Sequence, residues 1–65
     1  MIFDYTAAAA RAGIRPEALK RLREFVSAEF PGDEMMTELH LLRIIRSIER
    51  GDTTIEQVLR QELAS

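Results

Sequence analysis

The chain of 65 residues contains no cysteine, so neither a disulfide framework nor a thiolate zinc site can stabilise it. A chain this short buries only about 60% of the surface that it exposes when unfolded, so marginal stability is expected. The remaining ways to stabilise so small a domain are close helix packing and self-association. We therefore expect a homodimer.

Long hydrophobic runs are also lacking. The longest uncharged run is residues 5–10, whereas a membrane span needs roughly 18 apolar residues. Asp4 stands where a signal peptide would carry positive charge, and no apolar stretch with a cleavage site follows it. These features predict a cytoplasmic protein without a membrane partner.

No segment alternates apolar and polar residues for long enough to predict a strand. Hydrophobic residues make up 46% of the chain and charged residues 31%, a balance typical of globular proteins. The net charge is −2, which argues against nucleic-acid binding over the whole surface. Positive charge is nevertheless in excess over the first 25 residues, so an anionic partner should meet that half.

Capping residues predict where four helices begin and end. Asp4 can cap the first helix, with Ile2 and Phe3 as a hydrophobic staple, and Gly13 suits the left-handed position after the helix ends near Ala12. Pro16 fits the first turn of a second, strongly amphipathic helix, which residues 30–33 (FPGD) end.

A third helix is expected over residues 34–50, with Asp33 before it and Gly51 after it. Its apolar residues cover more than half of its circumference, which predicts a central helix or one that faces a second subunit. Thr53 begins a T-x-x-E pattern that predicts the cap of a fourth helix. The sequence thus predicts an all-α fold: a small four-helix domain over residues 1–65, with an N-terminal helix-turn-helix at about 4–29 and a helical hairpin at about 34–63.

The first corner has the residue types that a helix-turn-helix requires. Two helices that cross steeply need a small residue at their contact, a glycine in the turn and aliphatic residues that fill the angle between them. The chain supplies Ala9, Gly13 and Ile14, followed by Leu19 and Leu22 on the inner face of the second helix.

The segment AAARAGIRPEALKRL resembles the start of the MerR-type and excisionase-like helix-turn-helix proteins. The matching residues are Ala9, Gly13, Ile14, Pro16 and Leu19. The later run LLRIIRSIERGDTTIEQVL is similar to the helix pair that follows in that family. Two departures stand out: Arg15 replaces the usual serine or threonine before the proline, and only FPGDEM stands where the family has its wing.

The resemblance implies a regulatory protein that binds double-stranded DNA or modulates a DNA-binding partner. The side chains available on the exposed side of the second helix are Arg15, Glu17, Lys20, Arg21 and Arg23. Arginine and lysine can neutralise phosphates or bind guanine edges. The alternative is a solvated helix face with its own ion pairs, Glu17 with Arg21 and Lys20 with Glu24, in a protein interaction module that does not bind DNA.

No pattern in the chain predicts catalysis, a cofactor or a metal site. His40 is the only histidine and lacks partners at metal-ligand spacing, and the scattered serines show no arrangement for nucleophilic catalysis. We therefore expect no enzymatic activity. Met35 and Met36 fit either the core or an adaptable partner-binding surface. The strip formed by Arg43, Arg46 and Arg50 could contact phosphate or an acidic partner.

Overall fold

The computed structural model describes the backbone of residues 4–64 and the side chains of residues 4–61. It confirms an all-α fold. Four helices make up the described chain: α1 (Tyr5–Arg11), α2 (Pro16–Glu29), α3 (Glu34–Arg50) and α4 (Ile55–Ala64). No strand occurs between residues 4 and 64. The helix bounds expected for α2 and α3 agree with the structure to within about a residue.

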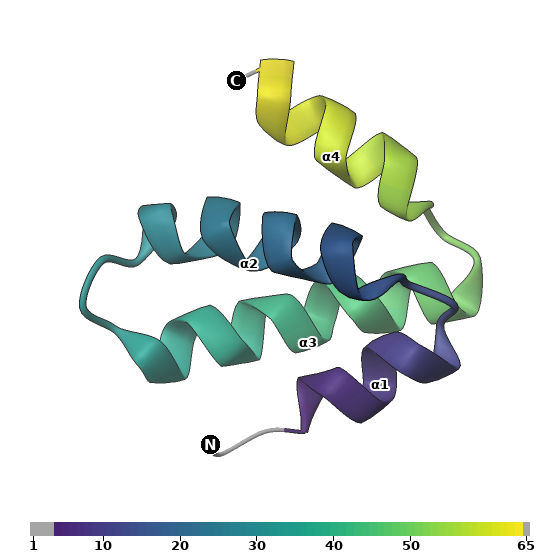
Figure 1. The fold of residues 1–65 in the computed structure, drawn as a ribbon, viewed down its shortest axis with the longest axis horizontal. Coiled ribbons are helices and arrows are strands. Elements are labelled where there is room, and N and C mark those ends of the chain that lie inside the picture. The colour runs from purple at the N-terminus through teal and green to yellow at the C-terminus, as the bar shows by residue number, and fades with distance from the viewer. Residues whose placement is uncertain (1–3, 65) are drawn as a thin grey trace.

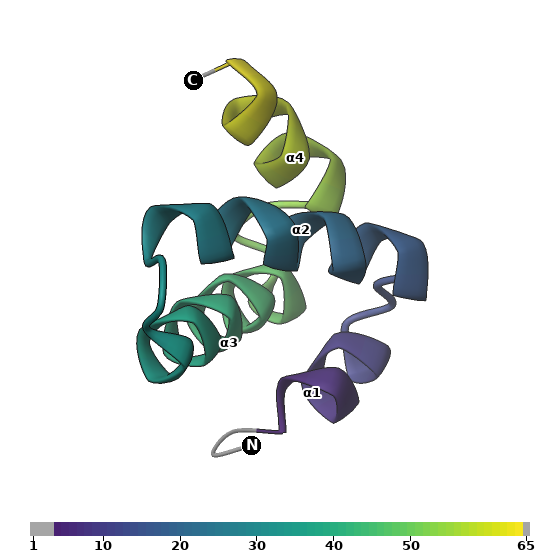
Figure 2. The same ribbon diagram turned by 60° about the vertical axis from the view of Figure 1, so that its left-hand side comes forward.

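The helices stack in three levels, and α2 forms the middle level. In Figure 1, α2 lies between α4 on one side and α3 on the other, and Figure 2 shows α1 beside α3 below α2. The central helix α3 packs against both α1 and α2, whereas α4 packs mainly against α2. This arrangement explains why so much of the circumference of α3 is apolar.

The corner between α1 and α2 is built by capping bonds at both ends of α1. Oδ1 of Asp4 accepts a hydrogen bond from the backbone N–H of Ala7 (3.1 Å), as the sequence predicts. Gly13 adopts φ 77°, and the N–H of Ile14 donates to the carbonyl of Ala9 (3.0 Å), which is the bonding of a Schellman motif. The predicted staple residues Ile2 and Phe3 lie outside the described part of the chain.

Two hydrophobic clusters form the core. Ala8, Ala9, Ile14 and Ile45 join α1 and the corner to α3, and Leu19 packs against them. Leu22, Val26, Leu41 and Val58 join α2, α3 and α4. Ala9, Ile14 and Leu19 therefore belong to the first cluster and Leu22 to the second. Because α1 packs mainly on α3, the direct alanine contact between α1 and α2 that a helix-turn-helix predicts is not confirmed. The packing partner of Ala9 in this cluster is α3, through Ile45.

The cap of α4 differs from the prediction by one residue. The N–H of Gln57 donates to Oγ1 of Thr54 (3.2 Å), and the carbonyl of Thr54 accepts from Val58 (3.0 Å), so Thr54 is the N-cap. Oγ1 of Thr53 donates instead to the side chain of Gln57 (3.1 Å). The predicted capping box of Thr53 with Glu56 is wrong, because α4 begins one residue later than that pattern requires.

Among the described residues, no helix combines the length and apolar character that crossing a bilayer requires.

Candidate functional site

The N-terminal half of α2 carries most of the residues that the sequence analysis assigns to DNA contact. Arg15 is the N-cap and makes no side-chain capping bond, and Pro16 occupies the first turn. Arg15, Glu17, Lys20 and Arg21 are all exposed. The buried residues of α2 are Leu22 and Val26, so the inward side of the helix is occupied by the second hydrophobic cluster.

Three of these exposed residues lie around a cleft between α2 and α4. Arg15, Glu17 and Arg21 line a cavity of about 380 Å³. Its other lining residues come from the corner, α2 and α4: Gly13, Ala18, Ile55, Glu56 and Leu59. The cleft therefore combines an apolar floor with a rim that carries both positive and negative charges.

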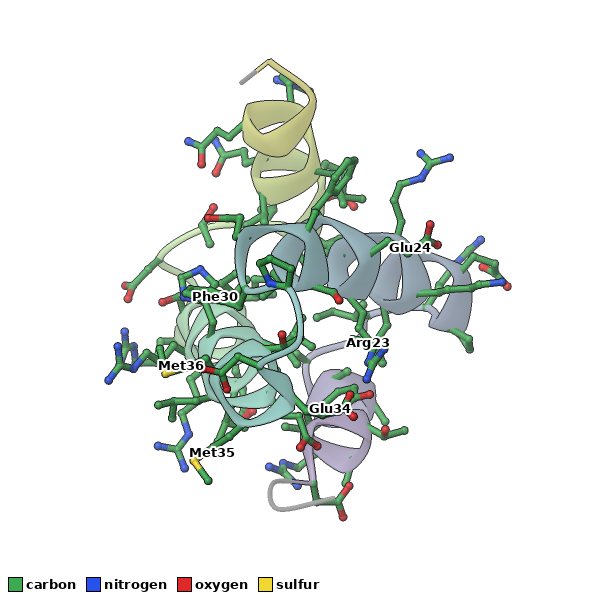
Figure 3. The ribbon with its side chains drawn as sticks, turned by 90° about the vertical axis from the view of Figure 1, so that its left-hand side faces the viewer. Arg23, Glu24, Phe30, Glu34, Met35 and Met36 are labelled. Carbon is green, nitrogen blue, oxygen red and sulfur yellow. The ribbon has the colours of Figure 1, made fainter. Side chains whose placement is uncertain are left out.

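Lys20 does not line the cleft. It lies one helical turn before Glu24, which Figure 3 shows on the outer side of α2. Neither of the expected ion pairs, Glu17 with Arg21 or Lys20 with Glu24, forms within the described part of the chain. The exposed cations of α2 are therefore not neutralised by carboxylates of their own helix.

Arg23 projects in another direction. Its Nε donates to the hydroxyl of Tyr5 (2.9 Å) and its Nη2 to Oε1 of Glu34 (2.6 Å). Figure 3 shows Arg23 and Glu34 pointing toward each other in the space between α2, α3 and α1. The hydrogen bond that Arg23 donates to Tyr5 is the largest of the effects that raise the pKa of Arg23, and the contact with Glu34 adds to it. Its guanidinium is thus held by α1 and α3.

The arginines and lysine of the chain fall into two groups. Arg11 pairs with Glu49 (3.9 Å), Arg23 with Glu34, and Arg50 with Asp52 (3.0 Å). The other described cations form no ion pair: Arg15, Lys20, Arg21, Arg43, Arg46 and Arg60. Two sets of unpaired cations thus lie on the surface, one on α2 and one on α3, with Arg60 on α4.

His40 packs against an aromatic ring. The ring centroids of His40 and Phe30 are 5.5 Å apart in an edge-to-face arrangement. Across the residues that the structure describes, no group of three or more potential ligands could hold a metal ion. The imidazole therefore has a packing partner at the turn between α2 and α3.

Glu38 is a buried acidic residue that was not predicted from the sequence. Glu38 is 4% exposed on α3, and its Oε1 has no hydrogen-bond partner among the described residues. A signal was present in the sequence, because Glu38 stands three and seven residues before the buried Leu41 and Ile45 and so shares their face of the helix.

Comparison of the chain with protein-family models, curated proteins and solved structures gave no match.

Proposed function

We propose that the chain is a small regulatory helix-turn-helix protein that contacts double-stranded DNA through the N-terminal half of α2, or modulates a DNA-binding partner through the same surface. The observation that supports this proposal is the group Arg15, Lys20 and Arg21, three exposed cations without carboxylate partners beside a corner stabilised by capping bonds. The role is one of binding, and no catalytic step belongs to it.

The dimensions of α2 suit the proposed contact. A helix with its side chains is about 10–12 Å wide, and the major groove of B-DNA is about 12 Å wide. Arg15, Lys20 and Arg21 would bind phosphates or guanine edges, and Glu17 could accept a hydrogen bond from the amino group of cytosine. Arg23 does not belong to this contact, because Tyr5 and Glu34 already engage its guanidinium. We assign to Arg23 the role of positioning α2.

A homodimer is part of the proposal. The longest extent of the chain is 29 Å, whereas two half-sites on one side of a duplex are about 34 Å apart. One copy therefore cannot place two recognition helices in successive major grooves. Two copies related by a twofold axis would do so and would also compensate for the missing wing, since each copy adds its own phosphate contacts.

The test is a titration of fluorescently labelled duplex DNA followed by anisotropy at several salt concentrations. Three phosphate contacts in each copy predict that the logarithm of the affinity falls with the logarithm of salt concentration, with a slope of about −3 per copy. Arg21→Ala and Lys20→Ala should each weaken binding by roughly three- to tenfold and reduce the slope by about one.

Arg60→Ala is the matched control, because it removes an exposed, unpaired arginine from α4. Equal losses from Arg21→Ala and Arg60→Ala would contradict the assignment to α2. Absence of binding at low salt would remove direct DNA contact altogether.

The cleft favours a second candidate function, a protein interaction module that does not bind DNA. Its floor of Ala18, Ile55 and Leu59 is apolar and has no use in binding phosphate, whereas a floor of this kind inside a charged rim suits an aliphatic or aromatic side chain of a protein partner. Absence of DNA binding at low salt is the result that would favour this candidate.

A further inference from the structure

The side of α3 that faces away from the rest of the molecule has an unusual composition. We call this side the outer face of α3 and define it by Asp33, Met35, Met36, Leu39, Arg43 and Arg46. Met35 is 55% exposed and Met36 37%, and they are the two large hydrophobic side chains that are exposed among the described residues. Water therefore contacts apolar surface that a well-packed monomer would bury.

This exposure is not a consequence of a poorly packed helix. Leu41 and Ile45, on the opposite side of α3, are completely buried in the two hydrophobic clusters. Figure 3 shows Met35 and Met36 pointing away from α1 and α2. The two clusters of the described residues thus form without the methionines, and the exposed atoms of the methionines remain available to another surface.

Charges lie in a definite order along the outer face. Asp33, at the start of α3, is exposed, and its carboxylate accepts a hydrogen bond from the backbone N–H of Met36. Among the described residues its negative charge has no cationic partner. Arg43 and Arg46, in the second half of the helix, are exposed and form no ion pair with any residue that the structure describes. From its start onward the face is acidic, then apolar, then basic.

Two copies of such a face are complementary when their helices run in opposite directions, because the acidic end of each then meets the basic end of the other. We infer that the outer face of α3 binds the outer face of a second copy of this chain, with the two α3 helices antiparallel across a twofold axis. The midpoint between Asp33 and Arg43 falls between Met36 and Leu39, so an axis at that point brings the apolar segments of both copies together. It also places Arg43 of each copy near Asp33 of the other, both about 7.5 Å along the helix from the axis.

Other partners fit this face less well. A nucleic acid would bind Arg43 and Arg46 but would be repelled by Asp33 and would leave the methionines exposed. An acidic protein segment would match only the basic half. A second copy satisfies the acidic, apolar and basic parts together.

The expected interaction is weak. A stable interface buries about 800 Å² on each partner, a large part of the 4541 Å² surface of this chain, and a contact made by one helix face falls below that size. We therefore expect a dimer with a dissociation constant of roughly 10–100 µM. The inference rests on the homodimer named in the proposed function and is independent of DNA binding.

The proposed dimer is tested by sedimentation equilibrium of the full chain without DNA, over a range of concentrations that brackets this dissociation constant. The wild-type chain should sediment as a monomer when dilute and as a dimer when concentrated. Met36→Glu should remain a monomer throughout, because it places two like charges next to the axis. Ala28→Glu is the matched control, since it adds a carboxylate at an exposed position of α2 and should leave association unchanged.

A double-mutant cycle locates the contact. Asp33→Asn keeps the helix cap while removing the charge, and Arg43→Gln removes the opposite charge. Each substitution should weaken dimerisation roughly three- to tenfold, and the double variant should lose less than the product of the two single effects. Circular dichroism would verify that each variant keeps its helices.

A wild-type chain that stays monomeric at the highest concentration would overturn the inference, as would a dimer that Met36→Glu does not weaken. Independent effects of Asp33→Asn and Arg43→Gln would overturn the antiparallel arrangement. Because these measurements contain no DNA, they can fail while the DNA titration succeeds, or the reverse.

Discussion

Glu38 carries a carboxylate into the interior of the molecule and leaves one of its oxygens without a partner. The side chain is 4% exposed, and Oε1 has no hydrogen bond. Removing a carboxylate from water is costly unless charges or hydrogen bonds of the protein replace its hydration. In a 65-residue domain, whose total stability is small, this cost is a substantial part of the free energy of unfolding.

Replacing Glu38 with methionine should stabilise the chain. Methionine has a similar length, can adapt its shape to the site and has no polar atom to desolvate. We expect the free energy of unfolding, measured by urea denaturation, to rise by about 1–3 kcal/mol. The control Glu24→Met, at an exposed position on α2, should change it by less than about 0.5 kcal/mol. A loss of stability in Glu38→Met would show that the carboxylate is satisfied in the folded protein.

Single residues also limit how much of the candidate site the sequence could predict. Arg21 and Arg23 are neighbours with the same side chain, yet Arg21 lines the cleft beside α4 and Arg23 bonds to Tyr5. The pattern of α2 predicts that both point away from Leu22, but it does not say which helix lies on either flank. That depends on the placement of α1 and α4, which no local rule determines.

Local capping chemistry fixes the boundaries of the helices. Asp4 and Asp33 cap α1 and α3, and left-handed glycines follow the ends of both helices, Gly13 after α1 and Gly51 after α3. These features were predictable because each depends on a few neighbouring residues. The start of α4 was less certain for the same reason: Thr53 and Thr54 can both act as caps, and the chain uses Thr54.

Removing the cap should loosen α4. Thr54→Ala eliminates the hydrogen bond from the N–H of Gln57 and should lower the free energy of unfolding by about 1 kcal/mol. Thr53→Ala removes only a bond between two exposed side chains and should cost less than half as much. Amide hydrogen exchange should show the larger increase in the first turn of α4 for Thr54→Ala. The reverse order of the two variants would restore the cap first predicted at Thr53.

At the scale of the whole molecule, one side chain joins three of the four described helices. Tyr5 belongs to α1, Arg23 to α2 and Glu34 to α3, and the guanidinium of Arg23 bonds to both of the other side chains. With only seven residues, α1 is too short to be stable alone, so it depends on such contacts and on the Ala8 and Ala9 packing. The sequence could not predict this link, because Tyr5 and Arg23 are 18 residues apart.

Arg23→Ala should therefore reduce the stability of the whole chain rather than act only on a bound ligand. We expect a loss of about 1–2 kcal/mol, mostly from the part-buried bond to Tyr5, because the pair with the exposed Glu34 adds little. Tyr5→Phe should reproduce most of that loss, whereas Glu34→Gln should cause only a small part of it. The pKa of Arg23 is raised in the folded protein, so the stability that Arg23 contributes is fully present below the ordinary arginine pKa and is lost only as pH rises through the folded-state pKa. Both pH 6 and pH 8 lie far below that range. The loss of stability in Arg23→Ala should therefore be the same at pH 6 and pH 8. Thermal unfolding of the three variants at both pH values measures these losses. If Arg23→Ala is as stable as the wild type, the positioning role is wrong and Arg23 is again a candidate for DNA contact.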